Sequence, residues 1–196
     1  MTEIVLDLET AGNRPGCAIL SIGAVAHVPG RPLDEVEEYY ATIDLESCQG
    51  AGLQIGAGTL AWWLEQDFAT RAEAFSGTQS LQYVLVTFAD WLKSVESPGG
   101  IEIYGKGPSF DCAILAAAYA ATGQKTPWDF RDERCVRTVM AEAKRILGED
   151  GLSELIVRPE VPHHALHDAR AEMRTLINIR WAIDRHLTAC GKELQA

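Results

Sequence analysis

The 196-residue sequence lacks the features that mark membrane and secreted proteins. No apolar run approaches the roughly 20 residues that are needed to cross a bilayer. The N-terminus has no basic segment followed by an apolar stretch and a small-residue cleavage site, which is the pattern of a secretory signal. We therefore expect a cytoplasmic protein with no membrane partner.

Cysteine is sparse and shows no metal-binding or redox spacing. The five cysteines are odd in number, and no two have the C-x-x-C spacing of zinc ribbons and thioredoxin-like sites. Several stand in apolar segments, which favours small core residues in a reducing compartment. They are Cys17, Cys48, Cys112, Cys135 and Cys190.

Basic residues are too few for a broad electrostatic surface. The chain has 17 Lys and Arg against 28 Asp and Glu, a net charge of -11. This balance argues against a nucleic-acid-binding face of the repressor type. It leaves a nuclease open, because carboxylates that bind metal add to the negative total while the bound cations offset them locally.

The remaining composition is that of a globular protein. Apolar residues make up 47% and charged residues 23% of the chain, and the length suits one domain with a substantial core. We therefore predict a single domain over residues 1–196.

Apolar patterning predicts three strands first and then an alternation of strands and helices. This order favours an α/β fold with a mixed sheet covered by helices on both sides, in which the first three strands form an antiparallel meander. The predicted strands are 3–8, 17–28, 36–43, 101–104 and a short edge strand at 128–130. The predicted helices are one with Thr59 as its N-cap, then 79–93, 112–122, 136–147 and about 168 to about 187. The Gly-rich segment 47–58 and the segment 148–162 are predicted loops.

Asp7 and Glu9 end the first predicted strand. Side chains alternate along a strand, so both carboxylates point to the same side. Two anions at the end of a buried strand repel each other and resist desolvation, and a divalent cation is a common compensation. The alternative is a strand that runs out into a solvated turn at residues 11–16.

Asp111 and Asp168 stand at predicted helix starts. Either one suits an N-cap, which is the structural alternative to a functional role. Open α/β sheets, however, place ligands in the loops at strand ends. The segment before Asp168 also holds three of the five histidines, at positions 163, 164 and 167, which favours a functional role for at least one of them.

In order and spacing, the segments 6–10, 109–111 and 163–169 resemble the three motifs of the DEDD superfamily of 3′→5′ exonucleases. The match is to its histidine-containing (DEDDh) branch and covers nearly the whole chain. The resemblance implies an RNase H-like five-stranded sheet, with an antiparallel meander followed by parallel strands. More narrowly, the segments 19–25, 60–66, 104–111 and 134–138 are similar to the exonuclease domain of phage and prophage proteins and of some bacterial exoribonucleases. Gly107 replaces an asparagine of many relatives, which concerns substrate positioning.

The resemblance implies a two-metal site. It assigns Asp7, Glu9, Asp111 and Asp168 as catalytic ligands of two Mg²⁺ or Mn²⁺ ions, with Asp7 bridging both. Hard oxygen ligands suit these ions, and two such ions activate water and neutralise charge on the reacting oxygens. It assigns His163 as the general base, a role that suits histidine because its ordinary pKa is near neutrality. His164 and His167 do not align with this base.

The implied substrate is a nucleic acid with a free 3′ end, single-stranded or overhanging, DNA or RNA, from which mononucleotides are released. Relatives of this type are often dimers, so a homodimer is left open.

Trp62 and Trp63 are adjacent on a helix, so one belongs to the core and the other can stack on a base.

Arg134 and Arg137 are candidates for phosphate contacts. The alternative for either arginine is an ion pair with Asp132 or Glu133, and the role of Lys106 is likewise undecided. The predicted substrate-binding residues are Leu8, Thr10, Trp63, Lys106, Phe110 and Arg134.

Two rival functions follow from the same residues. His167 next to Asp168, with histidines upstream, also suits an HD-type metal phosphohydrolase, but that architecture is all-helical and the N-terminal strands argue against it. A non-catalytic RNase H-like module that binds nucleic acid is the second rival. The presence of all five catalytic residue types argues against it.

Overall fold

The structure is a computed structural model that describes residues 1–32, 35–107 and 109–193, with side chains to residue 189. Its strands form one sheet in the order β3-β2-β1-β4-β5. β1, β2 and β3 are antiparallel neighbours, whereas β4 pairs parallel with β1 and β5 parallel with β4. The mixed five-stranded sheet predicted from the sequence is confirmed. The strands are β1 (Thr2–Thr10), β2 (Ile19–His27), β3 (Glu37–Thr42), β4 (Ile101–Gly105) and β5 (Glu133–Cys135).

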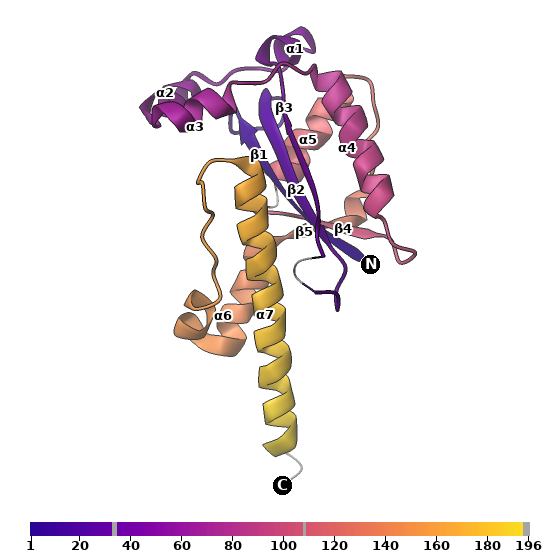
Figure 1. Cartoon of the computed structure of the whole chain (residues 1–196), viewed down its shortest axis with the longest axis vertical. Coiled ribbons are helices and arrows are strands. Elements are labelled where there is room, and N and C mark those ends of the chain that lie inside the picture. The colour runs from indigo at the N-terminus through magenta and orange to yellow at the C-terminus, as the bar shows by residue number, and fades with distance from the viewer. Residues whose placement is uncertain (33–34, 108, 194–196) are drawn as a thin grey trace.

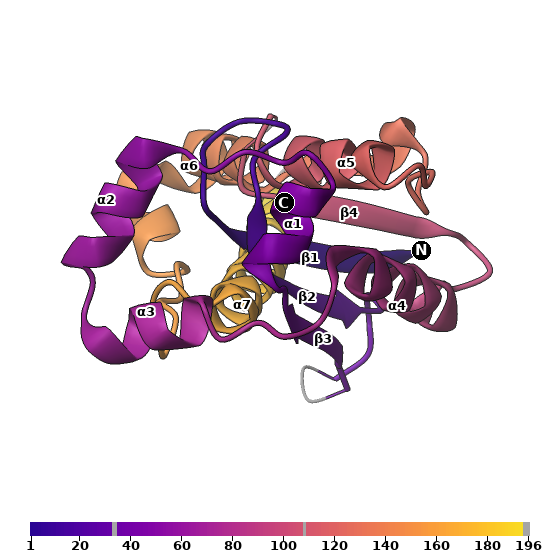
Figure 2. The ribbon, with the colours of Figure 1, turned by 90° about the horizontal axis from the view of Figure 1, so that it is seen from above.

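Helices cover both faces of this sheet. Figure 1 shows α7 on one side of the strands and α4 on the other, with the C-terminal half of α7 extending away from the sheet. Figure 2 shows α2 and α3 beside the N-terminal end of α7, at the opposite end of the molecule from α4 and α5. The helices are α1 (Leu45–Gly50), α2 (Ala57–Glu65), α3 (Phe68–Ala74), α4 (Leu81–Val95), α5 (Asp111–Ala121), α6 (Val136–Ser153) and α7 (Ala165–Glu193), with a 3-10 turn, η1, at Phe130–Asp132.

The alternation of β1 decides where its polar side chains lie. Ile4 and Leu6 are fully buried in the cluster that contains the apolar faces of α4 and α5. Val5, on the other face, is buried with Met173 and other residues of α7. Asp7 and Glu9 continue the series of Val5 with a period of two, so both carboxylates face α7.

Gly23 allows α7 to approach the sheet closely. Gly23 pairs with Asp7 across β1 and β2, and a Cβ atom at this position would lie 2.2 Å from the carbonyl carbon of Ala165. Only glycine leaves room for such an approach between backbones. The first turn of α7 is therefore held over the end of β1 that carries the carboxylates.

Several predicted boundaries were wrong. The predicted loop 47–58 overlaps α1, which begins after Asp44 because the carboxylate of Asp44 accepts hydrogen bonds from the amides of Glu46 and Ser47. α2 begins at Ala57 with Gly56 as N-cap, so Thr59 lies within the helix rather than at its cap. The helix α3, capped by Asp67, was not predicted.

The C-terminal half also differs from its prediction. The predicted edge strand 128–130 is wrong, because Asp129 caps η1 and the edge strand follows at Glu133–Cys135. α6 runs on through the predicted loop to Ser153, with a kink at Gly148, where φ is 80°. α7 begins at Ala165 and continues to Glu193, so it starts before Asp168 and runs beyond residue 187.

Three of the predicted core cysteines, Cys17, Cys48 and Cys112, are buried free thiols, and Cys135 is half-buried. The side chain of Cys190 and the loop residue Pro108 lie outside the described residues. Within the described part of the chain, no helix is both long and apolar enough to cross a membrane. The single-domain organisation stays a prediction.

Candidate active site

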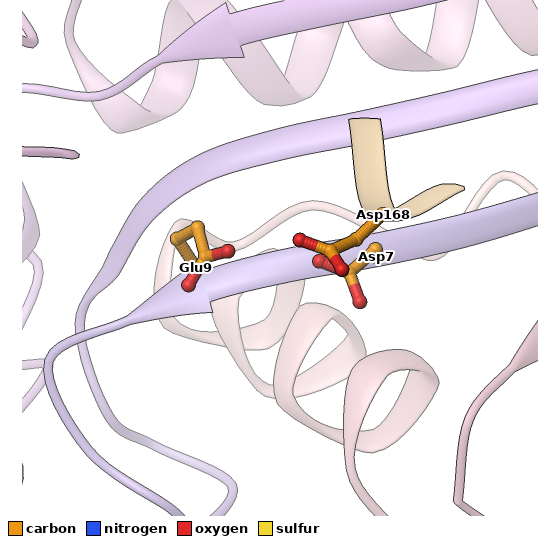
Figure 3. A group of neighbouring side chains, drawn as sticks. All are labelled: Asp7, Glu9 and Asp168. Atoms are coloured by element: carbon orange, nitrogen blue, oxygen red, sulfur yellow. The ribbon is translucent and has the colours of Figure 1, made fainter. Parts of the chain in front are cut away.

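Three carboxylates meet beside the end of β1. Asp7 and Glu9 come from this strand and Asp168 comes from the first turn of α7, and one oxygen of each lies within 4.8 Å of the others. In Figure 3 the carboxylate of Asp168 points toward Asp7, while Glu9 lies further along the strand. All three side chains are half-buried. The strand does end in a turn with exposed residues at 13–15, but the carboxylates of Asp7 and Glu9 are half-buried rather than fully solvated.

The fourth predicted carboxylate, Asp111, opens α5. Its side chain is 2% exposed, and its Oδ2 atom accepts a hydrogen bond of 2.9 Å from the amide of Lys106. The N-cap of α5 is Phe110, and no side chain caps this helix. Asp111 therefore does not serve as the N-cap, and with Asp7 and Glu9 it lines one cavity.

Asp168 has a structural contact as well. Its Oδ2 atom accepts a hydrogen bond of 3.2 Å from the amide of His164, one turn earlier. This satisfies one of the unpaired amides at the start of α7. The contact fixes the loop that carries the histidines to the same carboxylate that faces Asp7.

The acidic cluster is electrostatically strained without a cation. Burial, and then the charges of Asp111, Glu172 and Glu9, raise the pKa of Asp7 well above its ordinary value. Burial and the charges of Asp168 and Asp111 raise the pKa of Glu9 to about 8. Burial also raises the pKa of Asp111. To be ionised near neutral pH, buried carboxylates with raised pKa values need a compensating positive charge, and otherwise they stay protonated.

The donor set fits a divalent cation of the hard type. Mg²⁺ and Mn²⁺ prefer carboxylate oxygens and keep several waters, and the three clustered groups offer only such oxygens. The approach of Asp7, Glu9 and Asp168 to one another, together with the cost of burying their charges, indicates a cation site.

A cavity of about 610 Å³ opens above the carboxylates of Asp7, Glu9 and Asp111, while Asp168 lies outside its lining. The cavity is lined by the end of β1, by α2, by the loop before α5 and by His163. The imidazole of His163 is exposed to solvent, and its backbone φ is 60°, in a region that residues other than glycine seldom adopt. The ring packs edge-to-face against Trp62, with ring centroids 4.9 Å apart. Strained backbone of this kind gathers at functional sites.

The two other histidines of this loop have structural partners. His164 stacks on Tyr40 with ring centroids 4.4 Å apart, and the hydroxyl of Tyr40 donates to Glu73 at 2.9 Å. The Nδ1 atom of His167 lies 3.6 Å from a carboxylate oxygen of Glu160. Neither His164 nor His167 lines the cavity, which agrees with their interpretation as supporting residues.

Glu172 is a member of the cluster that the sequence analysis missed. It is 6% exposed, and one of its oxygens lies 2.8 Å from the ammonium group of Lys106. Burial raises its pKa to about 7 even though Lys106 lowers it. Since Glu172 is four residues after Asp168, both lie on the same helix face, and this spacing was a signal available in the sequence.

The prediction that Trp63 offers a ring to a base is wrong. Trp63 is 1% exposed, and its indole Nε1 donates to the carbonyl of Thr10 at 2.9 Å. Trp62 is 38% exposed and lines the same cavity. As expected, one of the two adjacent tryptophans is in the core and the other is at the surface. The exposed one is Trp62, whereas Trp63 was the predicted substrate-binding residue.

Arg134 lies outside the active-site cavity, and its contact with substrate stays a prediction. Its guanidinium pairs with Glu102 at 2.8 Å, a partner that differs from the predicted Asp132 and Glu133. It does not line the cavity, whereas Arg137, the second residue of α6, does. The other predicted substrate-binding residues, Leu8, Thr10, Lys106 and Phe110, all line the cavity. The hydroxyl of Thr10 is engaged with the carbonyl of Gly12.

A mixed sheet of this strand order, with carboxylates from β1, from the start of α5 and from α7, defines the class of RNase H-like exonucleases. Within this class, the family model described as the 3'-5' exoribonuclease Rv2179c-like domain matches residues 2–180, and the chain belongs to this family. The predicted enzyme class, a 3′→5′ exonuclease, is confirmed at the level of the family, which implies a nucleic acid substrate. The closer likeness to phage and prophage proteins stays a prediction.

Two solved structures share this fold. One, titled cell-death related nuclease 4 (CRN-4), superposes with a TM-score of 0.61 at 14% identity, over 90% of this chain and 62% of that chain. The other is the nuclease domain of 3'hExo, titled a DEDDh family member bound to rAMP. Its TM-score is 0.58 at 13% identity, over 93% of this chain and 92% of that chain. A comparison with curated protein sequences gave no match.

Proposed function

We propose that the protein is a divalent-metal-dependent exonuclease that removes mononucleotides from the 3′ end of a nucleic acid. The observation that carries this proposal is the meeting of Asp7, Glu9 and Asp168 within 4.8 Å, with His163 on the wall of the same cavity. Four carboxylates and one histidine are the parts that a two-metal phosphodiester hydrolysis requires.

Each residue has a distinct task in this proposal. Asp7, Glu9, Asp111 and Asp168 hold two Mg²⁺ or Mn²⁺ ions, which when bound supply Lewis acidity at the reacting oxygens. His163 accepts the proton of the attacking water at an imidazole nitrogen, and its exposure to solvent lets it pass this proton on. Arg137 lines the cavity, and its guanidinium suits a phosphate oxygen.

The terminal nucleotide lies in the cavity of about 610 Å³. Trp62 presents a partly exposed indole there, and an aromatic face stacks on any base. We propose a single-stranded or overhanging 3′ end as substrate, because a cavity between α2 and the loop before α5 accepts one strand that is not base-paired. The proposed substrate is RNA or DNA, since a contact to the 2′-hydroxyl decides between them.

The test is a progressive degradation assay. With Mg²⁺ or Mn²⁺, a 5′-labelled single-stranded oligonucleotide should shorten from its 3′ end, and EDTA should stop the reaction. Matched DNA and RNA strands, single-stranded and with 3′ overhangs, define the substrate. Immediate appearance of the label in a mononucleotide would contradict the polarity.

Two substitutions separate the roles within the site. Asp7→Asn removes one ligand charge and should lower the cleavage rate by at least about a thousandfold. The matched control is Asp90→Asn, at an exposed carboxylate paired with Lys93, which should leave the rate unchanged. His163→Ala should lower the rate by about a hundredfold or more and flatten its pH profile, without weakening metal binding measured by calorimetry. Full activity of Asp7→Asn would remove the metal-site hypothesis.

A further inference from the structure

A second cavity of about 260 Å³ lies beside α7, between β2, β3 and the segment before α7. Arg170 and Arg174, on its wall, follow Asp168 by two and six residues. At 3.6 residues per turn they project about 200° and about 240° around the helix axis from Asp168. The cavity is therefore on the other side of α7 from the acidic cluster, and it is lined by different residues from the active-site cavity.

Three arginines line this second cavity: Arg158, Arg170 and Arg174. Arg170 forms a two-pronged pair with Glu38, with hydrogen bonds of 2.7 and 2.6 Å. Among the described residues, Arg158 and Arg174 have neither a hydrogen bond nor an ion pair. Arg158 and Arg174 therefore bring two unpaired guanidinium groups into one cavity, in a chain with a net charge of -11.

The acidic groups around the cavity are already engaged. Glu38 is held by Arg170, and Glu160 lies 3.6 Å from the ring of His167. Three guanidinium groups thus face two carboxylates, which leaves a surplus of one positive charge in the cavity. The charge of Arg174 also helps to lower the pKa of Glu38. We refer to this site below as the arginine cavity.

The remaining wall of the arginine cavity is apolar. It includes Val25, Val36, Val157 and Met173. A cationic rim over an apolar floor suits a ligand that combines a phosphate with a flat ring, which is the chemistry of a nucleotide. Guanidinium groups bind phosphate oxygens in pairs and also stack on bases.

The two cavities lie on different sides of the start of α7 and share no lining residue. His163 lines the active-site cavity and His167 lines the arginine cavity. The half-buried ring of His164 lies near His167, with ring centroids 4.6 Å apart. A strand that reached from the active site to the arginines would have to pass this histidine segment.

We propose that the arginine cavity binds a nucleotide through its phosphate, with Arg158 and Arg174 as the phosphate-binding residues. Two sources share this chemistry. One is an upstream phosphodiester of the strand that is being degraded, and this source rests on the proposed function. The other is a free nucleoside monophosphate, which needs no exonuclease activity.

The experiment measures binding to the metal-free protein in EDTA, where the acidic cluster repels phosphate and leaves the arginine cavity as the attractive site. A labelled dodecanucleotide is followed by fluorescence anisotropy and 5′-AMP by calorimetry. The double variant Arg158→Ala/Arg174→Ala should weaken binding of the phosphate-bearing ligand by tenfold or more. For the dodecanucleotide, the loss of two phosphate contacts should also reduce the slope of log K against log salt concentration by about 1.4, at roughly 0.7 per phosphate.

The matched control is Arg131→Ala/Arg145→Ala, which removes the same charge at two exposed arginines outside both cavities. Arg158→Ala alone is the second variant, because an exposed side chain without polar partners among the described residues can be removed without disturbing the fold.

Weakened binding of the dodecanucleotide identifies the strand as ligand, and weakened binding of 5′-AMP identifies the free nucleotide. Equal binding of both ligands by the double variant and the control would overturn the proposal. Cleavage of a dinucleotide by the wild-type protein with Mg²⁺ tests the proposed function separately, so the two failures are distinguishable.

Discussion

At the scale of single residues, Trp62 and Trp63 divide two tasks between neighbouring positions of α2. Trp63 fills the core beneath the active-site cavity and donates its indole N–H to Thr10 on β1. Trp62 presents a partly exposed ring to the cavity and packs against His163. Adjacent helical residues point about 100° apart, so the chain can place one ring in each environment.

This division predicts opposite effects of two similar substitutions. Trp63→Ala leaves a large void and an unpaired carbonyl, and should lower the free energy of unfolding by about 3–5 kcal/mol. Trp62→Ala should leave the Tm nearly unchanged but raise KM by about 5- to 150-fold, since stacking on a base contributes about 1–3 kcal/mol. Thermal unfolding and steady-state kinetics separate the two effects. A Trp62→Ala variant with unchanged KM would show that no base stacks there.

Residue chemistry also explains which site residues the sequence could predict. Asp7, Glu9, Asp111, His163 and Asp168 belong to short motifs with a definite order. Glu172 lies on α7 outside these motifs, and its approach to the site depends on how this helix packs against the sheet. Arg137 was a candidate together with Arg134, and the packing of α6 decides that Arg137 lines the cavity. The pairing of Arg134 with Glu102 joins β5 to β4, and strand neighbours far apart in sequence are not visible in local patterns.

At the scale of elements, strands were predicted better than helix boundaries. Short apolar runs mark β1 and β2, apolar alternation marks β4, and short turns mark the meander. The short helices α1 and α3 depend on the side-chain caps of Asp44 and Asp67, which act over one turn and leave little periodicity. The start of α7 at Ala165 depends on a contact with Gly23, which is a tertiary feature.

That contact leads to a prediction for Gly23→Ala. The added methyl group would overlap the backbone of Ala165 and should push the first turn of α7 away from β1. Overpacking of this kind costs about 1–3 kcal/mol, and the displacement should lower kcat because Asp168 and His163 lie on the moved segment. Thermal unfolding and kinetics under saturating Mg²⁺ measure both effects.

The matched control is Gly50→Ala at the end of α1, where an added Cβ meets open space. Its Tm should stay constant or rise slightly, because alanine reduces the entropy of the unfolded chain. Wild-type kcat in Gly23→Ala, despite a lower Tm, would show that the position of the first turn of α7 is not critical for the reaction.

At the scale of the whole molecule, the acidic cluster couples stability to pH. Burial and neighbouring charges raise the pKa of Glu9 to about 8 and that of Glu172 to about 7 in the folded protein. Both groups therefore hold protons in the folded state that they release in the unfolded state between about pH 5 and about pH 8. Their stabilising contribution is complete below the unfolded pKa and is lost as the pH rises through the folded pKa.

The metal-free protein should consequently lose stability between about pH 5 and about pH 8. About 1 kcal/mol shifts the Tm of a domain of this size by about 2–4 °C, so the decline should amount to several degrees. His164 acts in the opposite sense, since burial lowers its pKa. The comparison is therefore made with Asp7→Asn, which keeps this histidine but removes the carboxyl of Asp7, whose own pKa is raised well above its ordinary value, and should show a flatter profile.

Saturating Mg²⁺ should reverse the slope, because cations bind the deprotonated carboxylates of the folded state and stabilise it by mass action. Thermal unfolding across this pH range, in EDTA and in Mg²⁺, makes the measurement. Parallel profiles for wild-type and Asp7→Asn in EDTA would show that the cluster is not strained. A strained cluster relieved by metal would mean that the charges that destabilise the metal-free fold also create its affinity for the cation.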